Sequence, residues 1–400
     1  MSNPGFLTAH ATHPDAMMAL ALAAAQLDAQ RASRAPVDRG RYAPLGFIYI
    51  TDHYAGQADA LLAELRLRWP GVPWVGAVGV GVAVSGVEYF DEPALVLMLG
   101  ELPPGSFELF SGERPLLRDD LQTALVHADG GTPDIGELIG ELSARTTSGY
   151  LFGGLAASRG RAVQFCAPVP PAGLPAAAGL YEGGISGVAF TSEVRLLSRV
   201  TQGCQPVGPV RRVDAAQDNI VLRLDGRSAL QCLLDDLGID LGQPREAVPR
   251  LRSTLAGLTD AGDDALLRDQ FGADTRVRHL IGLDPMRGAV AIADQVEPGM
   301  TLAFCRRDVE AARRDLVRIC AEIREELCPA DGGPSGRILG AVYVSCSGRG
   351  GPHFGGDSAE LQIVRHALGE VPLAGFFAGG EIARRHLFGY TGVLTVFVEY

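Results

Sequence analysis

The chain has 400 residues, a formal net charge of -12 at neutral pH and 47% hydrophobic residues. This length predicts two domains, because one hydrophobic core seldom serves so many residues. The acidic balance excludes nucleic acid and anionic membranes as expected partners, since both require a basic surface. Seven cysteines at irregular spacings, without a CxxC pair, predict free thiols in the reducing cytoplasm.

Helix and strand patterns alternate along the chain, which predicts an α+β or α/β fold with mixed sheets flanked by helices. The first part predicts helices at about 14–34, 57–69 and 135–144, and strands at 45–51, 72–84, 92–100, 150–158, 162–168 and 185–192. The later part predicts helices at about 227–238 and 308–327, and strands at 289–293 and 300–305. Pattern-breaking residues near 200–218 indicate a junction, so we expect two related halves, at 1–205 and 215–400.

A strand–helix–strand–strand pattern occurs at 46–99 and again at 340–398. The loop after the first strand is longer in the second copy, and an enlarged loop on a repeated scaffold often carries function. Aligning the copies on their first strands sets Cys346 opposite Asp52. Aligning them on their later strands sets Glu381 opposite Val82, so the scaffold tolerates an apolar residue where the second copy has a carboxylate.

The enlarged loop, VSCSGRGGPHFGGD at 344–357, follows a strand and contains five glycines. Glycines allow backbone amides to converge on an anion, and Arg349 would add a bidentate partner for a carboxylate or phosphate. Together with Arg349, Glu381 would match the two charges of an amino acid. The alternatives are a connecting loop with Arg349 in solvent, and a local ion pair of Glu381 with Arg384 or Arg385.

Cys346 and His353 suggest two further chemistries. Cys346 is a candidate nucleophile, with His353 as its base and Asp357 or Glu381 orienting the base, although cysteines at strand ends are often structural. His353 is also the best-placed of eight histidines for an axial haem ligand. No CxxCH is present, so any haem would be bound without a covalent link.

The C-terminal half of the FIST domain (F-box and intracellular signal transduction proteins) is similar to two segments, SCSGRGGPHFGGDSAE and VPLAGFFAGGEIARRHLFGYTGVLTVFV. VLRLDGRSALQCLLDDLG resembles the start of that half, and GYLFGGLAAS and GLYEGGISGVAF resemble the close of the N-terminal half. The resemblance implies an intracellular sensory module that binds a small ligand and signals to a partner. In this family some members are reported to bind haem and respond to nitric oxide.

We therefore expect a cytoplasmic, non-enzymatic sensor of an amino acid or other small carboxylate. Its resemblance implies a separate signalling protein as partner, such as a histidine kinase or a cyclic-dinucleotide enzyme. A haem-based nitric oxide sensor and a cysteine-dependent hydrolase remain alternatives. No metal or cofactor is expected, apart from His353 as ligand if haem is bound. The expected ligand-binding residues are Ser345, Cys346, Ser347, Arg349, His353, Gly380, Glu381, Gly153 and Gly154.

Overall fold

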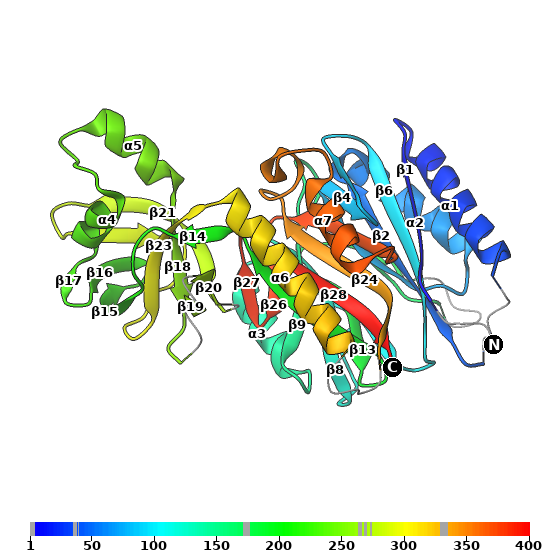
Figure 1. Ribbon diagram of the computed structural model, residues 1–400. Coiled ribbons are helices and arrows are strands. Elements are labelled where there is room, and N and C mark those ends of the chain that lie inside the picture. Colours follow the sequence, from blue (N-terminus) through cyan, green and yellow to red (C-terminus); the bar gives the residue numbers. More distant parts are fainter. Residues whose placement is uncertain are drawn as a thin grey trace. The chain divides into compact units, whose positions relative to one another are not determined.

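The fold combines helices with mixed β-sheets, which confirms the predicted α+β class (Figure 1). The computed structural model describes residues 5–34, 38, 40–170, 177–262, 266–267, 270–272, 274–328 and 335–400. Within these residues, no helix is both long and apolar enough to cross a bilayer.

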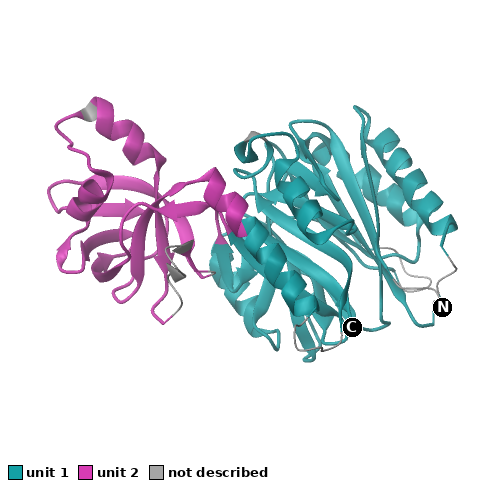
Figure 2. Cartoon of the chain, viewed as in Figure 1, with its two compact units in different colours: residues 1–201, 316–387, 391–400 teal, residues 202–315, 388–390 magenta. Residues whose placement is uncertain are grey.

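The chain forms two compact units (Figure 2). Unit 1 comprises Met1–Thr201, Leu316–Leu387 and Thr391–Tyr400, and unit 2 comprises Gln202–Asp315 and Phe388–Tyr390. Unit 1 therefore contains residues from both ends of the chain. The expected halves at 1–205 and 215–400 describe a division of the sequence, and that division remains a prediction.

Unit 1 contains three copies of one strand–helix–strand motif, each in its own six-stranded sheet. The first copy, residues 43–102, follows β1 (Leu7–Thr12) and α1 (Ala16–Ala32). It comprises β2 (Ala43–Thr51), η1 (Asp52–Gln57), α2 (Ala58–Arg68), β3 (Trp74–Gly79), β4 (Gly81–Val84), β5 (Val87–Phe90) and β6 (Ala94–Leu102). Its sheet has the order β1-β6-β2-β3-β10-β11, in which β2 is parallel to β3 and antiparallel to β6.

The middle copy, residues 121–191, follows β7 (Phe107–Ser111). It comprises β8 (Leu121–Asp129), α3 (Ile135–Ala144), β9 (Tyr150–Ala156), β10 (Val163–Ala167), β11 (Leu180–Glu182) and β12 (Ile185–Thr191). Its sheet has the order β27-β26-β9-β8-β12-β7. As in the first copy, the first two strands of the motif, β8 and β9, are parallel, and the closing strand β12 is antiparallel to β8.

The last copy, residues 337–399, follows β13 (Arg195–Gln202) and α6 (Val309–Leu327). It comprises β24 (Arg337–Cys346), η2 (Gly351–Phe354), α7 (Ala359–Leu368), β25 (Leu373–Ala378), β26 (Glu381–Arg384), β27 (His386–Phe388) and β28 (Thr391–Glu399). Its sheet has the order β13-β28-β24-β25-β4-β5. Again β24 is parallel to β25 and antiparallel to β28.

The copies are joined by exchanged hairpins. Each sheet ends in a hairpin from another copy: β4 pairs with β25, β26 pairs with β9, and β10 pairs with β3. The repeat predicted at 46–99 and 340–398 is confirmed, and the middle copy is a third occurrence that the sequence patterns did not indicate. Because each hairpin completes a neighbouring sheet, one copy alone would leave the edges of two sheets unpaired.

Strand register shows which residues correspond between copies. A glycine of the second strand faces the first strand in each copy: Gly76 faces Ile48, Gly153 faces Val126 and Gly375 faces Tyr343. A Cβ on these glycines would lie 1.7 to 1.9 Å from the facing carbonyl oxygen, so only glycine fits. By this register Cys346 corresponds to Thr51, and the expected match with Asp52 is wrong by one residue.

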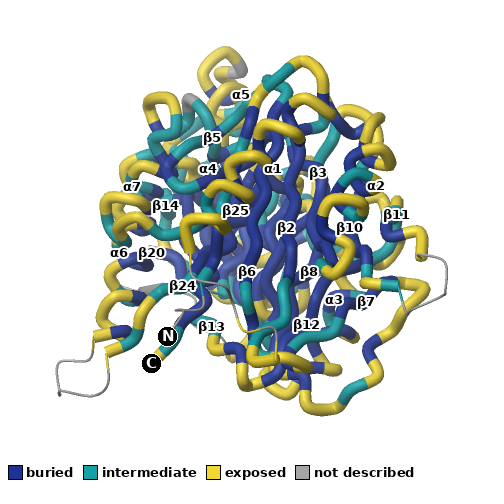
Figure 3. The backbone as a smooth tube through the Cα atoms, turned by 90° about the vertical axis from the view of Figure 1, so that its right-hand side faces the viewer, coloured by how far each residue is buried: buried dark blue, intermediate teal, exposed yellow. Residues whose placement is uncertain are grey.

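The core of the first copy lies between its sheet and two helices. Buried residues of α1 recur at helical spacing, at Ala16, Ala19, Leu20, Ala23, Ala24 and Leu27, and join a cluster with α2, β2 and β6. Asp15 caps α1 by accepting a hydrogen bond from the Met18 amide. Figure 3 shows the buried strands of this sheet beside the largely exposed outer faces of α1 and α2.

Unit 2 is built on an eight-stranded sheet with the order β14-β23-β15-β16-β22-β21-β18, and β17 pairs with β16 off this path. Its strands are β14 (Cys204–Pro206), β15 (Arg211–Gln217), β16 (Ile220–Leu224), β17 (Arg227–Ser228), β18 (Thr254–Thr259), β21 (Arg276–Asp284), β22 (Ala289–Ile292) and β23 (Thr301–Arg307), and β19 (Leu266–Leu267) pairs with β20 (Gln270–Phe271). Its helices are α4 (Ala229–Leu237) and α5 (Pro244–Ser253). The apolar face of α4 supplies four residues to the core of this unit: Ala229, Leu230, Cys232 and Leu233.

Candidate functional site

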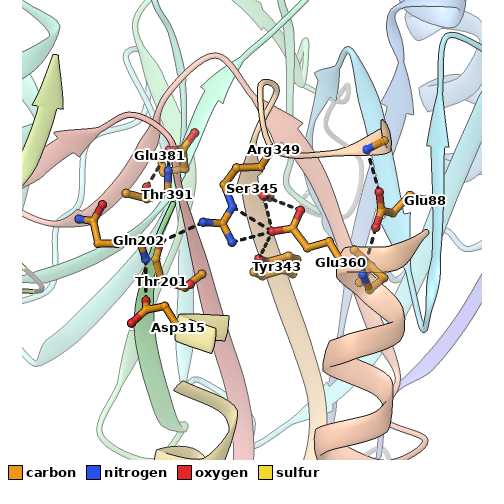
Figure 4. Close-up of polar contacts among 12 residues, drawn as sticks. Glu88, Thr201, Gln202, Asp315, Tyr343, Ser345, Arg349, Glu360, Glu381 and Thr391 are labelled. Atoms are coloured by element: carbon orange, nitrogen blue, oxygen red, sulfur yellow. Dashed lines mark hydrogen bonds and ion pairs between the residues drawn. The ribbon is translucent and has the colours of Figure 1, made fainter. Parts of the chain in front are cut away.

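Glu381 is a fully buried carboxyl group with only one of its oxygens well satisfied (Figure 4). It begins β26 and faces Gly154 in the neighbouring strand. Its Oε2 accepts hydrogen bonds from the amide (3.0 Å) and the hydroxyl (2.7 Å) of Thr391. Among the described residues, Oε1 has no hydrogen-bond partner of normal geometry. An unsatisfied buried oxygen costs stability, which indicates that Glu381 has a role other than stabilising the fold.

The corresponding residues of the other copies show that the fold does not require a carboxylate here. Glu381 corresponds by register to Val82 and to Gln164. Gln164 is satisfied at both ends of its amide: Oε1 accepts from Ser186 Oγ at 2.7 Å, and Nε2 donates to the Gly183 carbonyl at 3.2 Å. The scaffold thus accommodates an apolar side chain or a fully bonded amide, which makes Glu381 the strongest functional candidate.

Burial raises the pKa of Glu381 to about 8, against the opposing effects of the Thr391 hydrogen bonds, the Arg349 charge and the Cys346 thiol. Burial therefore favours the protonated form of Glu381. Since Oε2 already accepts two hydrogen bonds, we infer that the proton lies on Oε1. Glu381 can then donate a hydrogen bond, or release its proton to bind a cation.

Arg349 and Glu360 form a buried ion pair beside Glu381 (Figure 4). Nε and Nη2 of Arg349 lie 3.0 and 2.9 Å from Glu360 Oε1. Tyr343 and Ser345 also donate to Glu360, at 2.7 and 3.1 Å. Arg349 is therefore not in solvent, and a ligand carboxylate would have to share its guanidinium with Glu360.

One amide of the glycine loop and one amide of α7 bind a carboxylate that belongs to the protein itself. Glu88, on the β5 strand of the first copy, accepts hydrogen bonds from the Gly351 amide at 3.1 Å and the Leu361 amide at 3.0 Å. Burial and the nearby Glu360 charge raise the pKa of Glu88 to about 7, although these amides act to lower it. A carboxylate of the protein itself therefore occupies the Gly351 amide of the loop and the Leu361 amide of α7.

The loop is held against aromatic side chains. A Cβ at Gly350 would lie 2.1 Å from the ring of Phe90 and 2.5 Å from that of Phe377. These rings are in contact, with centroids 4.2 Å apart. Glycine at 350 therefore allows the loop backbone to approach the rings, which is a structural reason for one of the five glycines.

The remaining expected residues near the loop fall into different environments. Cys346 lies beside Glu381, whose pKa its thiol lowers. Ser347 is exposed, and its amide donates to the Ala378 carbonyl at 2.8 Å. Gly380 is buried, and its carbonyl accepts from the Leu155 amide at 2.8 Å.

Gly153 and Gly154 have packing roles. The facing Val126 carbonyl requires glycine at 153, as the register shows. A Cβ at Gly154 would lie 2.7 Å from the Val344 side chain and 2.8 Å from that of Ala378. Both glycines thus permit the sheets to approach closely.

His353 is half-buried, and its ring meets the ring of Phe354 edge-on at 5.8 Å. The guanidinium of Arg349 lies over the same Phe354 ring at 5.2 Å. A haem requires an apolar pocket around its axial ligand, whereas the aromatic ring beside His353 also packs against the buried guanidinium of Arg349. The hydrolase alternative needs His353 as the base for Cys346, and Cys346 also has Glu381 as a neighbour.

Three polar residues near the loop or Arg349 are not among the expected ligand-binding residues: Glu88, Tyr343 and Glu360. Glu360 had a detectable signal, because it lies four residues before the buried Val364 and so on the core-facing side of α7. Tyr343 had none, since its strand is buried along its whole length from Gly340 onward. Glu88 lies far away in sequence, and only the exchanged hairpin brings it to the loop.

Comparison with known proteins identifies two family matches that together cover most of the chain. The FIST N domain matches residues 44–227, and the FIST C domain matches residues 229–384. The uncharacterized protein Rv0628c of Mycobacterium tuberculosis (strain ATCC 25618 / H37Rv) is 29% identical over 408 residues, covering 97% of this chain and 98% of that protein. The uncharacterized protein Mb0898c of Mycobacterium bovis (strain ATCC BAA-935 / AF2122/97) is 33% identical over 227 residues, covering 54% of each chain.

Proposed function

This chain belongs to the FIST family, whose domains are associated with sensing in signal transduction, and we propose that it is a cytoplasmic, non-enzymatic small-ligand sensor. The proposed ligand is an amino acid or another small carboxylate, and the proposed output is a separate signalling protein. The observation that carries the proposal is the fully buried carboxyl group of Glu381, whose Oε1 has no hydrogen-bond partner of normal geometry among the described residues, at a position where the other copies have valine or a satisfied glutamine.

The charges of the cluster favour a ligand with an ammonium group. Arg349 is already neutralised by Glu360, so a carboxylate alone gains little from it. An ammonium group beside Oε1 would favour the ionised form of Glu381 and supply its missing partner. The carboxylate of an amino acid would then lie on the Arg349 side of the cluster and contribute less to affinity than the ammonium.

A thermal-shift screen tests this proposal, with amino acids and the matching carboxylates that lack the amine. We expect an amino acid to raise the melting temperature of the wild-type protein, and Glu381→Gln to abolish that shift. The effect of the amine-free carboxylate should be nearly the same in both proteins. Gln164→Leu, at the corresponding position of another sheet, is the control and should keep the wild-type response.

Two outcomes would contradict the proposal. Equal loss of response to both ligand classes in Glu381→Gln would show that the ammonium is not what Glu381 recognises. A strong Soret band after expression with added haem, shifting on exposure to nitric oxide, would favour the haem-based sensor instead.

A further inference from the structure

The polar groups around Glu381 contact the residues at which the chain leaves unit 1. Thr201 is the last residue of unit 1 before residues 202–315, and Thr391 is the first after residues 388–390. Thr391 donates both its amide and its hydroxyl to Glu381. The Thr201 carbonyl accepts a hydrogen bond from Nη1 of Arg349 at 3.5 Å (Figure 4).

These two chain crossings are adjacent in one sheet. Thr201 lies near the end of β13, Thr391 begins β28, and the two strands are neighbours. Beyond the first crossing, within unit 2, the Gln202 amide donates to the buried carboxylate of Asp315 at 2.7 Å. Asp315 is itself the last residue of unit 2 before the chain returns to unit 1. Polar side chains thus bind backbone atoms of Thr201, Gln202 and Thr391.

Glu381 and Arg349 also act on each other electrostatically. Each charge contributes to the environment of the other, and both groups are buried. An ionised Glu381 would compete with Glu360 for the guanidinium, since all three groups share a low-dielectric interior. A change of charge at Glu381 would therefore alter its hydrogen bonds with Thr391 directly, and the hydrogen bond of Arg349 with the Thr201 carbonyl indirectly.

We propose that these contacts transmit the state of the ligand site to the chain crossings at Thr201 and Thr391, and thereby to the segments of unit 2 that they join. The role of the ligand rests on the function proposed above. The coupling between Glu381 and the crossings does not, because it follows from the hydrogen bonds of Glu381 with Thr391 and of Arg349 with Thr201, and from the electrostatic interaction of Glu381 with Arg349.

The middle copy offers a matched control. Gln164 corresponds to Glu381, and its partner Ser186 lies within the continuous strand β12. Its hydrogen bonds therefore hold a strand with both ends inside unit 1. Removing the Gln164 side chain should disturb this local region without reaching residues 200–203 or 388–391.

Hydrogen–deuterium exchange of the full chain, without ligand, tests the coupling. Glu381→Ala removes the acceptor of the Thr391 amide, and we expect exchange to accelerate about tenfold at 388–391 and also at 200–203. Glu381→Gln keeps one acceptor oxygen and should show a smaller increase in both segments. Gln164→Ala should accelerate exchange near Ser186 alone. Thr391→Val, which removes only the hydroxyl, replaces Glu381→Ala should that variant not fold.

Faster exchange confined to 388–391 in Glu381→Ala would overturn the coupling. So would an acceleration at 200–203 in Gln164→Ala as large as that in Glu381→Ala. Because no ligand is added, this result is independent of the thermal-shift screen. If no ligand shifts the melting temperature but exchange accelerates in both segments of Glu381→Ala, the proposed ligand is rejected and the coupling is retained. If a ligand shifts the melting temperature but exchange does not accelerate at 200–203, the ligand is retained and the coupling is rejected.

Discussion

The carboxylate of Glu88 accepts a hydrogen bond from the amide of Gly351, 263 positions away in the sequence. Glu88 comes from the hairpin of the first copy, and Gly351 from the enlarged loop of the last copy. This contact pairs an amide of the loop with a carboxylate of the protein itself. It also fastens two copies of the motif at the point where their sheets are joined.

Replacing Glu88 by alanine should destabilise unit 1. The amides of Gly351 and Leu361 would lose their acceptor in a partly buried place, which costs about 1–3 kcal/mol. Urea unfolding monitored by circular dichroism measures this loss. Glu113→Ala, at an exposed position, is the control and should change the free energy of unfolding by less than about 0.5 kcal/mol. Equal stability of both variants would mean that water replaces the carboxylate without cost.

Stability should fall as pH rises through the neutral range. Burial raises the pKa of Glu381 from 4.5 to about 8, and that of Glu88 from 4.5 to about 7. Between pH 4.5 and these values the folded chain holds protons that the unfolded chain has released, so raising the pH favours unfolding. Unfolding in urea at pH 5 to 8.5 measures the slope. Glu381→Gln does not titrate and should give a shallower decline, and an unchanged slope would show that Glu381 is ionised in the folded protein.

Breaking the buried ion pair should have a large effect. Arg349→Met leaves the charge of Glu360 buried without its partner, which typically costs about 3–5 kcal/mol. Arg365→Met breaks an exposed pair with Glu370 and should cost less than about 1 kcal/mol. Urea midpoints of the two variants give the comparison. Similar values would indicate that water reaches Glu360 in the folded protein.

Two glycines of the loop should respond differently to alanine. At Gly350 the added methyl group would overlap the rings of Phe90 and Phe377, and we expect a loss of about 1–3 kcal/mol. At Gly356 nothing lies within 4 Å of the added carbon, so the effect should stay within about 0.5 kcal/mol. Thermal unfolding distinguishes them. A neutral Gly350→Ala would mean that the loop does not rest on these rings.

Much of the fold and part of the site followed from local patterns in the sequence. Residues 135–144 form the helix that their periodicity predicts, and the correspondence of Glu381 with Val82 agrees with the strand register. Both depend on residues close in sequence, where spacing alone decides which side chains share a face.

The tertiary structure decided the pairing within the site and between the copies. The alignment of Cys346 was wrong by one residue because the residues of two buried strands do not by themselves define how the strands correspond, and only ladder hydrogen bonds define register. Arg349 was expected to bind a ligand, whereas the structure pairs it with Glu360, a carboxylate on the core-facing side of α7. Local patterns in the sequence specify a repeated α+β scaffold with one elaborated loop. The exchanged hairpins pair strands that are far apart in the sequence, and the Arg349–Glu360 pair depends on how the loop folds back onto α7. Local spacing encodes neither of these contacts.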